Sequence, residues 1–170
     1  MFFDSKANLL GKIGETIIRN LLASKHEVTM SEDAMDPKKD MSIENTSIEV
    51  KTLTLNYVTN SFFLPDQQLD KCLNVDRLFF VEVPKYTNWP IFVYEKLKPR
   101  HGKRHTFKNG TSGRLYPLTE MAFVDIIDDK DLIKRMKELS TSVYHDLTMS
   151  TPEAAEERKQ LISSLPRSVI

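Results

Sequence analysis

The chain has a single cysteine, few glycines and no long hydrophobic run, and each of these shortages excludes a class of protein. One cysteine, Cys72, in 170 residues cannot form an internal disulfide, which excludes a disulfide-stabilised scaffold and suits a reducing compartment. Five glycines and eight prolines are too few for a collagen-like repeat or a long flexible linker. No apolar stretch approaches the roughly 18 residues of a membrane-spanning helix, and the first residues lack the pattern of a signal peptide. We therefore expect a soluble intracellular protein, in the cytoplasm or inside a virus-infected cell, with no membrane partner.

The composition is that of a globular protein with a proper core. Hydrophobic residues make up 40% of the chain and charged residues 28%, and the length fits one domain with an appended element. We predict a domain over residues 1–148, with a basic loop at 96–114, and a C-terminal helical tail over 149–170.

Positive charge is concentrated in one segment, although the net charge of the whole chain is zero. The segment 96–114 contains no Asp or Glu, and the rest of the chain holds 17 basic against 24 acidic residues. Such asymmetry predicts one positive face that can orient a polyanion. The candidate nucleic-acid contacts in this segment are Lys96, Lys98, Arg100, His101, Lys103, Arg104, His105, Lys108 and Arg114. The alternative interpretation of this segment is a solvated hairpin without a nucleic-acid role. The aromatic residues within and beside it either stack on bases or anchor the loop; they are Tyr94, Phe107 and Tyr116.

Hydrophobic periodicity predicts alternating helices and strands. An apolar stripe at helical spacing predicts a helix over 5–24, with Asp4 or Ser5 as its N-cap. Thr151 followed by Pro152 predicts the start of a terminal helix. The other expected elements are strands at 25–30, 40–44, 47–53, 77–83 and 91–94, and helices at 65–73 and 128–144. Residues 121–127 form either a further strand or an approach to the helix at 128–144, and a cluster of aspartates near the start of that helix serves as caps. This order predicts an α/β or α+β fold in which helices flank a central mixed sheet.

The predicted hairpin at 40–53 carries a group of polar side chains that suits phosphodiester chemistry. Glu49 and Lys51 are two residues apart on a strand and share a face, while the flanking Ile48 and Val50 point into the core. Asp40 begins the preceding strand, beside them if the two strands pair. Two carboxylates and a carbonyl are ligands that Mg²⁺ accepts. A solvated strand face is the alternative explanation of the pair Glu49 and Lys51.

Each residue of this group has a candidate role. Asp40 and Glu49 would bind the metal, with the carbonyl of Val50 as a third ligand. Lys51 would orient or deprotonate the attacking water, or stabilise negative charge on the phosphate. Glu15, in the first predicted helix, would bind a water ligand of the metal or a second ion.

The order of a helical Glu15, then Asp40, then Glu49-Val50-Lys51 resembles the PD-(D/E)XK nuclease superfamily over residues 5–55. The resemblance is to its variant with an additional helical glutamate, found in Holliday junction resolvases. It implies a restriction-endonuclease-like core, Mg²⁺ as cofactor with Mn²⁺ able to substitute, and a homodimer. Gln67 or Gln68 in the next helix is a possible further match. The sequence departs from the family motif at one position, because the residue before Asp40 is a lysine and not the proline of the family name. An Asp-Pro pair occurs at residue 36, and we interpret it as part of a turn.

Two classes of function follow from these residues. The first is an Mg²⁺-dependent endonuclease that hydrolyses DNA, either site-specific or structure-specific, with RNA left open as a substrate. The alternative is a catalytically inactive module that binds nucleic acid on the same scaffold through residues 96–114. A third hypothesis, an interaction protein without a nucleic-acid role, predicts no salt-dependent binding of DNA.

Overall fold

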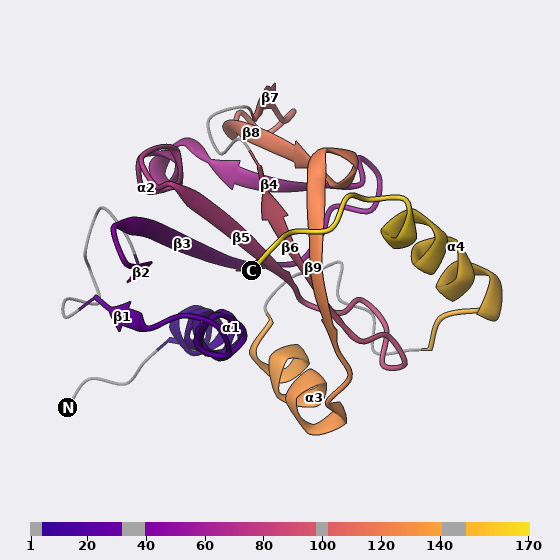
Figure 1. The fold of residues 1–170 in the computed structure, drawn as a ribbon. Coiled ribbons are helices and arrows are strands. Elements are labelled where there is room, and N and C mark those ends of the chain that lie inside the picture. Colours follow the sequence, from indigo (N-terminus) through magenta and orange to yellow (C-terminus); the bar gives the residue numbers. More distant parts are fainter. Residues whose placement is uncertain (1–4, 32–39, 98–101, 141–148) are drawn as a thin grey trace.

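A computed structural model describes residues 5–31, 40–97, 102–140 and 149–170, and its architecture is the predicted mixture of helices and strands (Figure 1). The helices are α1 (Lys6–Ala23), α2 (Leu69–Leu73), α3 (Lys130–Leu139) and α4 (Pro152–Ser163), with short 3₁₀ turns at Asp66–Gln68 and Leu118–Glu120. The strands are β1 (Val28–Met30), β2 (Met41–Ile43), β3 (Thr46–Leu53), β4 (Ser61–Pro65), β5 (Arg77–Glu82), β6 (Ile91–Lys96), β7 (Lys103–Thr106), β8 (Ser112–Pro117) and β9 (Met121–Ile127). The predicted mixed α/β class is therefore confirmed.

The strands form two sheets. The larger has the order β1-β2-β3-β5-β6-β9, in which β3 and β5 run parallel and the other neighbours run antiparallel. The smaller has the order β4-β8-β7 and is antiparallel. In Figure 1 the smaller sheet lies above the larger one, on the side away from α1 and α3.

Each face of the larger sheet is buried in its own hydrophobic core. Helices α1 and α3 cover the face that carries Ile48, Val50 and Phe79. Helices α2 and α4 and the smaller sheet cover the opposite face, which carries Leu78 and Phe80. Alternate residues of a strand point to opposite faces, so the apolar run of β5 fills both cores at once.

Helix α1 begins and packs as its sequence predicts. The hydroxyl of Ser5 accepts a hydrogen bond from the backbone N–H of Asn8, which confirms Ser5 as the N-cap. Leu10, Ile17 and Leu22 are buried on the side that faces the sheet. A Cβ at Gly14 would overlap Oγ1 of Thr52, so glycine allows the helix to lie close against β3.

The predicted C-terminal segment forms helix α4 and packs against the sheet. Thr151 caps α4 and Pro152 occupies its first turn, as predicted. Ile162 is buried in the second core. Beyond the helix, the backbone of Phe123 in β9 bonds to Pro166 and Ser168.

Some predicted boundaries differ from the structure. The β2–β3 turn lies at Glu44 and Asn45, one residue earlier than predicted, and Glu44 adopts a positive φ of 53° there. Strand β4 was not predicted, because Ser61–Pro65 has two adjacent phenylalanines and no alternation. The predicted turn at residue 36 and the end of the predicted helix at 141–144 lie outside the described residues. Within the described ranges, no helix is both long and apolar enough to cross a bilayer.

Candidate functional site

The backbone of the β2–β3 hairpin brings Asp40 and Glu49 onto adjacent strands. Met41 pairs with Ile48 in the antiparallel register, so the residues that come next are Asp40 before β2 and Glu49 within β3. The N–H of Asp40 donates to the carbonyl of Ile48 at 2.9 Å. Oδ2 of Asp40 accepts a hydrogen bond of 2.9 Å from the N–H of Val50. The Asp40 carboxylate is thus held at the point where the β2–β3 ladder ends.

Glu49 and Lys51 share a face of β3, as predicted from their spacing. Their parallel partners on β5 are Leu78 and Phe80, whose side chains belong to the second core. Glu49 is 2% exposed, whereas Lys51 is half-buried. A carboxylate this buried lies in a low-dielectric environment, where a nearby cation interacts with it more strongly than in water.

The carbonyl of Val50 points toward the same place as the Asp40 carboxylate. In an extended strand the N–H and C=O of one residue point toward the same neighbouring strand. The N–H of Val50 donates to Asp40, so the carbonyl of Val50 also faces the space that precedes the first residue of β2. The carboxylates of Asp40 and Glu49 and the carbonyl of Val50 are oxygens of the kind that Mg²⁺ prefers, which makes them chemically suitable ligands.

Glu15 lies on α1, which covers the other face of β3. Its neighbour Gly14 packs against Thr52, and Thr52 shares a face with Ile48 and Val50. Among the described residues, no three His, Cys, Asp or Glu side chains gather as a metal-binding cluster, so Glu15 does not complete one with the two hairpin carboxylates. A metal role for Glu15 stays a prediction.

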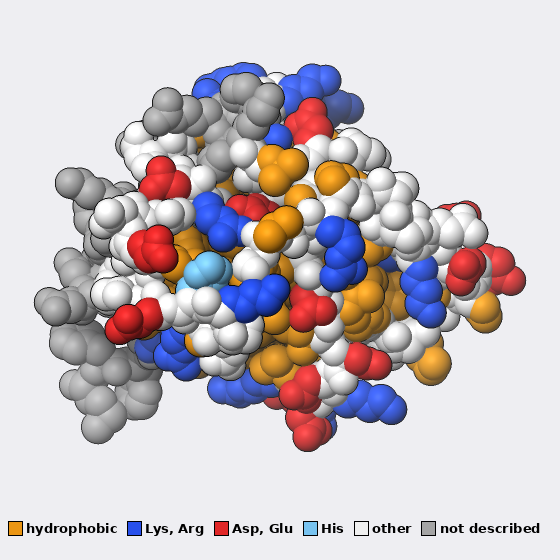
Figure 2. Space-filling model, viewed as in Figure 1, with side chains coloured by type: hydrophobic (Ala, Val, Ile, Leu, Met, Phe, Trp, Pro, Cys, Tyr) orange, Lys and Arg blue, Asp and Glu red, His pale blue; other side chains and the backbone are white. Residues whose placement is uncertain are grey.

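The predicted basic segment is mostly the hairpin β7–β8 of the smaller sheet. Figure 2 shows Lys and Arg side chains gathered at the top of the view, where Figure 1 places these strands. Lys103, Arg104 and Lys108 are exposed, while His105 and Arg114 are half-buried. Lys98, Arg100 and His101 lie outside the described residues. The exposed Gln67 and Gln68 lie in the 3₁₀ turn before α2.

Two members of the basic segment are already engaged by carboxylates. Lys96 is 4% exposed and its Nζ lies 3.5 Å from Glu120, which places it in the fold and not on the exposed basic surface. Arg104 forms a bidentate pair with Asp66, at 2.7 and 3.0 Å.

Of the three aromatic residues proposed to stack on bases, only Phe107 has an exposed face. Tyr94 and Tyr116 are each 0% exposed and anchor the second core. Phe107 lies at the tip of the β7–β8 hairpin and is half-buried. Its ring meets that of Phe63 edge-on, with centroids 4.7 Å apart.

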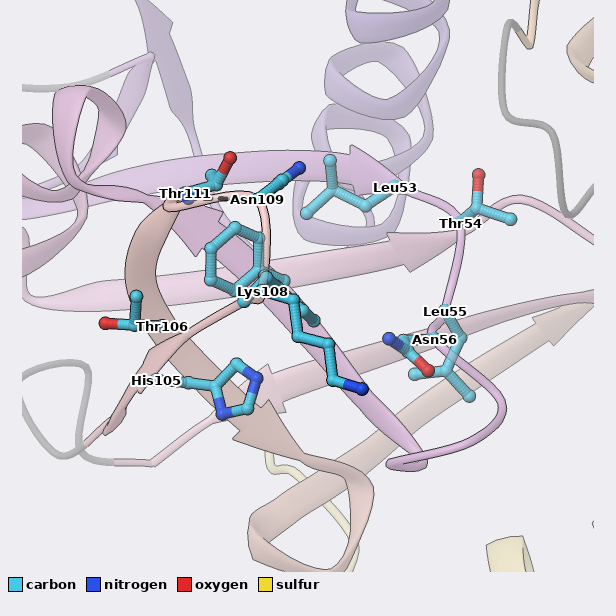
Figure 3. A pocket seen from close by; sticks show the side chains of 11 residues that line it. Leu53, Thr54, Leu55, Asn56, His105, Thr106, Lys108, Asn109 and Thr111 are labelled. Atoms are coloured by element: carbon cyan, nitrogen blue, oxygen red, sulfur yellow. Dashed lines mark hydrogen bonds between the residues drawn. The ribbon is translucent and has the colours of Figure 1, made fainter.

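A groove of about 860 Å³ separates the end of β3 from the tip of the β7–β8 hairpin. Figure 3 shows Leu53 to Asn56 along one wall and His105 to Thr111 along the other. Leu53 is two residues beyond Lys51 on the same face of β3, so the groove begins about 7 Å along the strand from Lys51. Sequence periodicity did not reveal this groove, because its walls are about 50 residues apart in the chain.

A buried polar network holds the segment that follows the groove wall. Glu82 is 0% exposed and accepts hydrogen bonds from Tyr57 at 3.1 Å, from Tyr94 at 2.8 Å and from the guanidinium of Arg158 in α4. Burial raises the pKa of Glu82, while Arg158 and the two tyrosine hydroxyls oppose this increase. Burial also raises the pKa of Tyr94 and of Tyr57, so both hydroxyls keep their protons and act as donors. The guanidinium lies over the ring of Phe92, at 5.3 Å.

Comparison of the chain with protein-family models, with curated proteins and with solved structures finds no match.

Proposed function

We propose that this protein is a metal-dependent nuclease that hydrolyses phosphodiester bonds of DNA at the end of the β2–β3 ladder. The observation that carries the proposal is the hydrogen bond from Val50 N–H to Asp40, which fixes one carboxylate beside the strand that bears Glu49 and Lys51. The spacing of these residues resembles that of the PD-(D/E)XK nucleases.

The chain's own residues suit the separate tasks of the reaction. Asp40 and Glu49, with the carbonyl of Val50, would hold one Mg²⁺. When bound, this ion would supply a Lewis acid that neutralises phosphate charge and lowers the pKa of water. The half-buried ammonium of Lys51 would stabilise the negative charge that builds up on the phosphoryl oxygens. Water adds to phosphorus, the bond from phosphorus to the leaving sugar oxygen breaks, and that oxygen takes up a proton.

The basic hairpin supports a nucleic-acid substrate. Exposed Lys108 lines the groove that begins near Lys51, and Lys103 is exposed on strand β7 of the same hairpin. Cationic side chains of this kind contact phosphates and make binding fall with salt concentration. A homodimer and an intracellular location accompany the proposal as expectations from the resemblance and from the sequence.

The test is cleavage of supercoiled plasmid in Mg²⁺ and in EDTA by the wild type and by three variants. We expect Glu49→Gln and Lys51→Met each to lower the rate by about 100-fold or more, because each removes a charge that would act on the phosphate or its metal. Glu44→Gln, an exposed carboxylate in the turn of the same hairpin, is the matched control and should cleave like the wild type.

Thermal unfolding of each variant separates loss of chemistry from loss of fold. Cleavage by the wild type that persists in EDTA would contradict the proposal. Cleavage at the wild-type rate by folded Glu49→Gln and folded Lys51→Met would also contradict it. Binding of DNA without any cleavage by the wild type would favour the alternative, an inactive nucleic-acid-binding module.

A further inference from the structure

We propose that the groove between the end of β3 and the β7–β8 hairpin binds an unpaired nucleotide, so that the preferred substrate carries a single-stranded segment next to the scissile phosphate. This inference rests on the proposed nuclease function for the site, but the binding that it predicts can be measured without catalysis.

The groove offers flat apolar surface to a planar ring. Phe63 and Phe107 contact each other edge-on at 4.7 Å, and His105 meets Phe107 edge-on at 4.5 Å. All three rings are half-buried, so each keeps a solvent-facing part along the groove. Aromatic faces stack on any nucleobase, but only on a base whose own faces are free of its neighbours in a duplex.

Two asparagine side chains give the groove oriented hydrogen-bond donors. Oδ1 of Asn56 accepts from the N–H groups of Val58 and Thr59, at 3.0 and 3.2 Å. Oδ1 of Asn109 accepts from the N–H of Thr111 at 3.0 Å. Since the oxygens are held by the local turns, the NH₂ group of each amide is directed elsewhere, and a nucleobase carbonyl or ring nitrogen is a suitable acceptor.

The charge of the groove suits the phosphates on either side of such a base. Lys108 is among its lining residues, and the part of the lining that the structure describes contains no Asp or Glu. Figure 3 shows the long side chain of Lys108 on the hairpin wall, opposite the segment that ends at Asn56. A cationic groove with aromatic rings and few acids is typical of surfaces that bind single strands.

The position of the groove connects the base to the proposed chemistry. Leu53 lines the groove and lies two residues beyond Lys51 on one face of β3, which is about 7 Å along the strand. This is close to the distance between successive phosphates of an extended strand. The groove wall that ends at Asn56 is held in place by the next residue, because the hydroxyl of Tyr57 donates a hydrogen bond to the buried Glu82.

The binding test uses fluorescence anisotropy in EDTA, so that no cleavage intervenes. The probes are a labelled 12-nucleotide single-stranded DNA, the same sequence as a blunt duplex, and the corresponding single-stranded RNA. We expect the single strands to bind more tightly than the duplex. Phe107→Leu, which keeps apolar volume but removes the ring, should weaken single-strand binding about tenfold. Phe107→Trp, the matched variant that keeps a ring, should bind single strands at least as tightly as the wild type.

Cleavage of a 5′-flap, a 3′-flap and a blunt duplex in Mg²⁺ provides the second readout. Faster cleavage of a flapped substrate, with the preference reduced in Phe107→Leu, supports the inference. Equal binding of duplex and single strand, or equal effects of Phe107→Leu on both, would overturn it. If plasmid is cleaved but Phe107→Leu changes nothing, the groove proposal fails and the nuclease stands. If single strands bind as expected but no substrate is cleaved, the nuclease fails and the groove stands.

Discussion

In an Arg158→Met variant, the carboxylate of Glu82 stays buried but loses the guanidinium paired with it. Glu82 is 0% exposed and Arg158 is 6% exposed, so water cannot replace the lost partner without opening the structure. The hydroxyls of Tyr57 and Tyr94 remain as donors to the carboxylate. Methionine has a volume suited to the same aromatic surroundings, which limits the loss of packing.

The expected decrease in the free energy of unfolding of Arg158→Met is a large fraction of the total for a protein of this size. Removing one partner of a buried ion pair costs about 3–5 kcal/mol, because the remaining charge is left uncompensated. For a chain of this size, each kcal/mol lowers the melting temperature by about 2–4 °C, so we expect a decrease of roughly 10 °C. The free energy of unfolding of a folded protein is only about 5–15 kcal/mol. The variant should therefore unfold at much lower urea concentrations than the wild type.

The assay is urea unfolding followed by circular dichroism, at pH 8 and at pH 5. Burial raises the pKa of Glu82 in the folded protein, and loss of Arg158 removes the largest opposing cause. A carboxyl with a raised folded pKa contributes stability that is present below its unfolded pKa and lost as the pH rises through the folded pKa. The deficit of Arg158→Met should therefore be smaller at pH 5 than at pH 8.

Two further variants make the reasoning refutable. Arg19→Met removes an exposed arginine from α1 and should change stability by no more than about 0.5 kcal/mol. Glu82→Gln combined with Arg158→Met removes both charges and should recover part of the loss. A loss below about 1 kcal/mol in Arg158→Met, or a deficit independent of pH, would refute the role assigned to this pair.

Two other predictions concern packing and alkaline stability. Gly14→Ala should destabilise the protein by about 1–3 kcal/mol, because its Cβ overlaps Thr52 Oγ1, although alanine favours an exposed helix by about 1 kcal/mol. In a Thr52→Ala background the same change should cost clearly less in urea unfolding; an equal cost in both backgrounds would contradict the contact. Burial raises the pKa of Tyr116 from 10.0 to about 12, so stability should be full below pH 10 and decrease as the pH rises to 12, since the unfolded chain ionises first. Tyr116→Phe should show a smaller decrease of melting temperature between pH 10 and 12, and an unchanged slope would argue against this assignment.

Local patterns in the sequence predicted much of the fold and part of the site. The apolar stripe of α1, the cap at Ser5 and the Thr151-Pro152 start of α4 depend on neighbouring residues only. The shared face of Glu49 and Lys51 follows from the alternation of any strand. These features could be predicted because the interactions that determine them span only a few residues.

Other features were decided by contacts between distant segments. Lys96 belongs to the most basic stretch of the chain, yet the packing of β6 against its neighbours buries it beside Glu120. Arg158 occurs in a run of charged residues typical of a solvated helix face, but it pairs with Glu82, 76 positions earlier. No periodicity contains this information.

The sequence by itself determined which side chains are available for the proposed chemistry, because the carboxylates, amines and aromatic rings are given by the residue types alone. Only the tertiary structure decided where they meet. Asp40 contacts the backbone of Val50 because β2, which begins at the next residue, pairs with β3. The groove exists because a separate hairpin folds over the end of β3. The physical reason is that burial and long-range pairing select one arrangement among many that the local patterns allow equally.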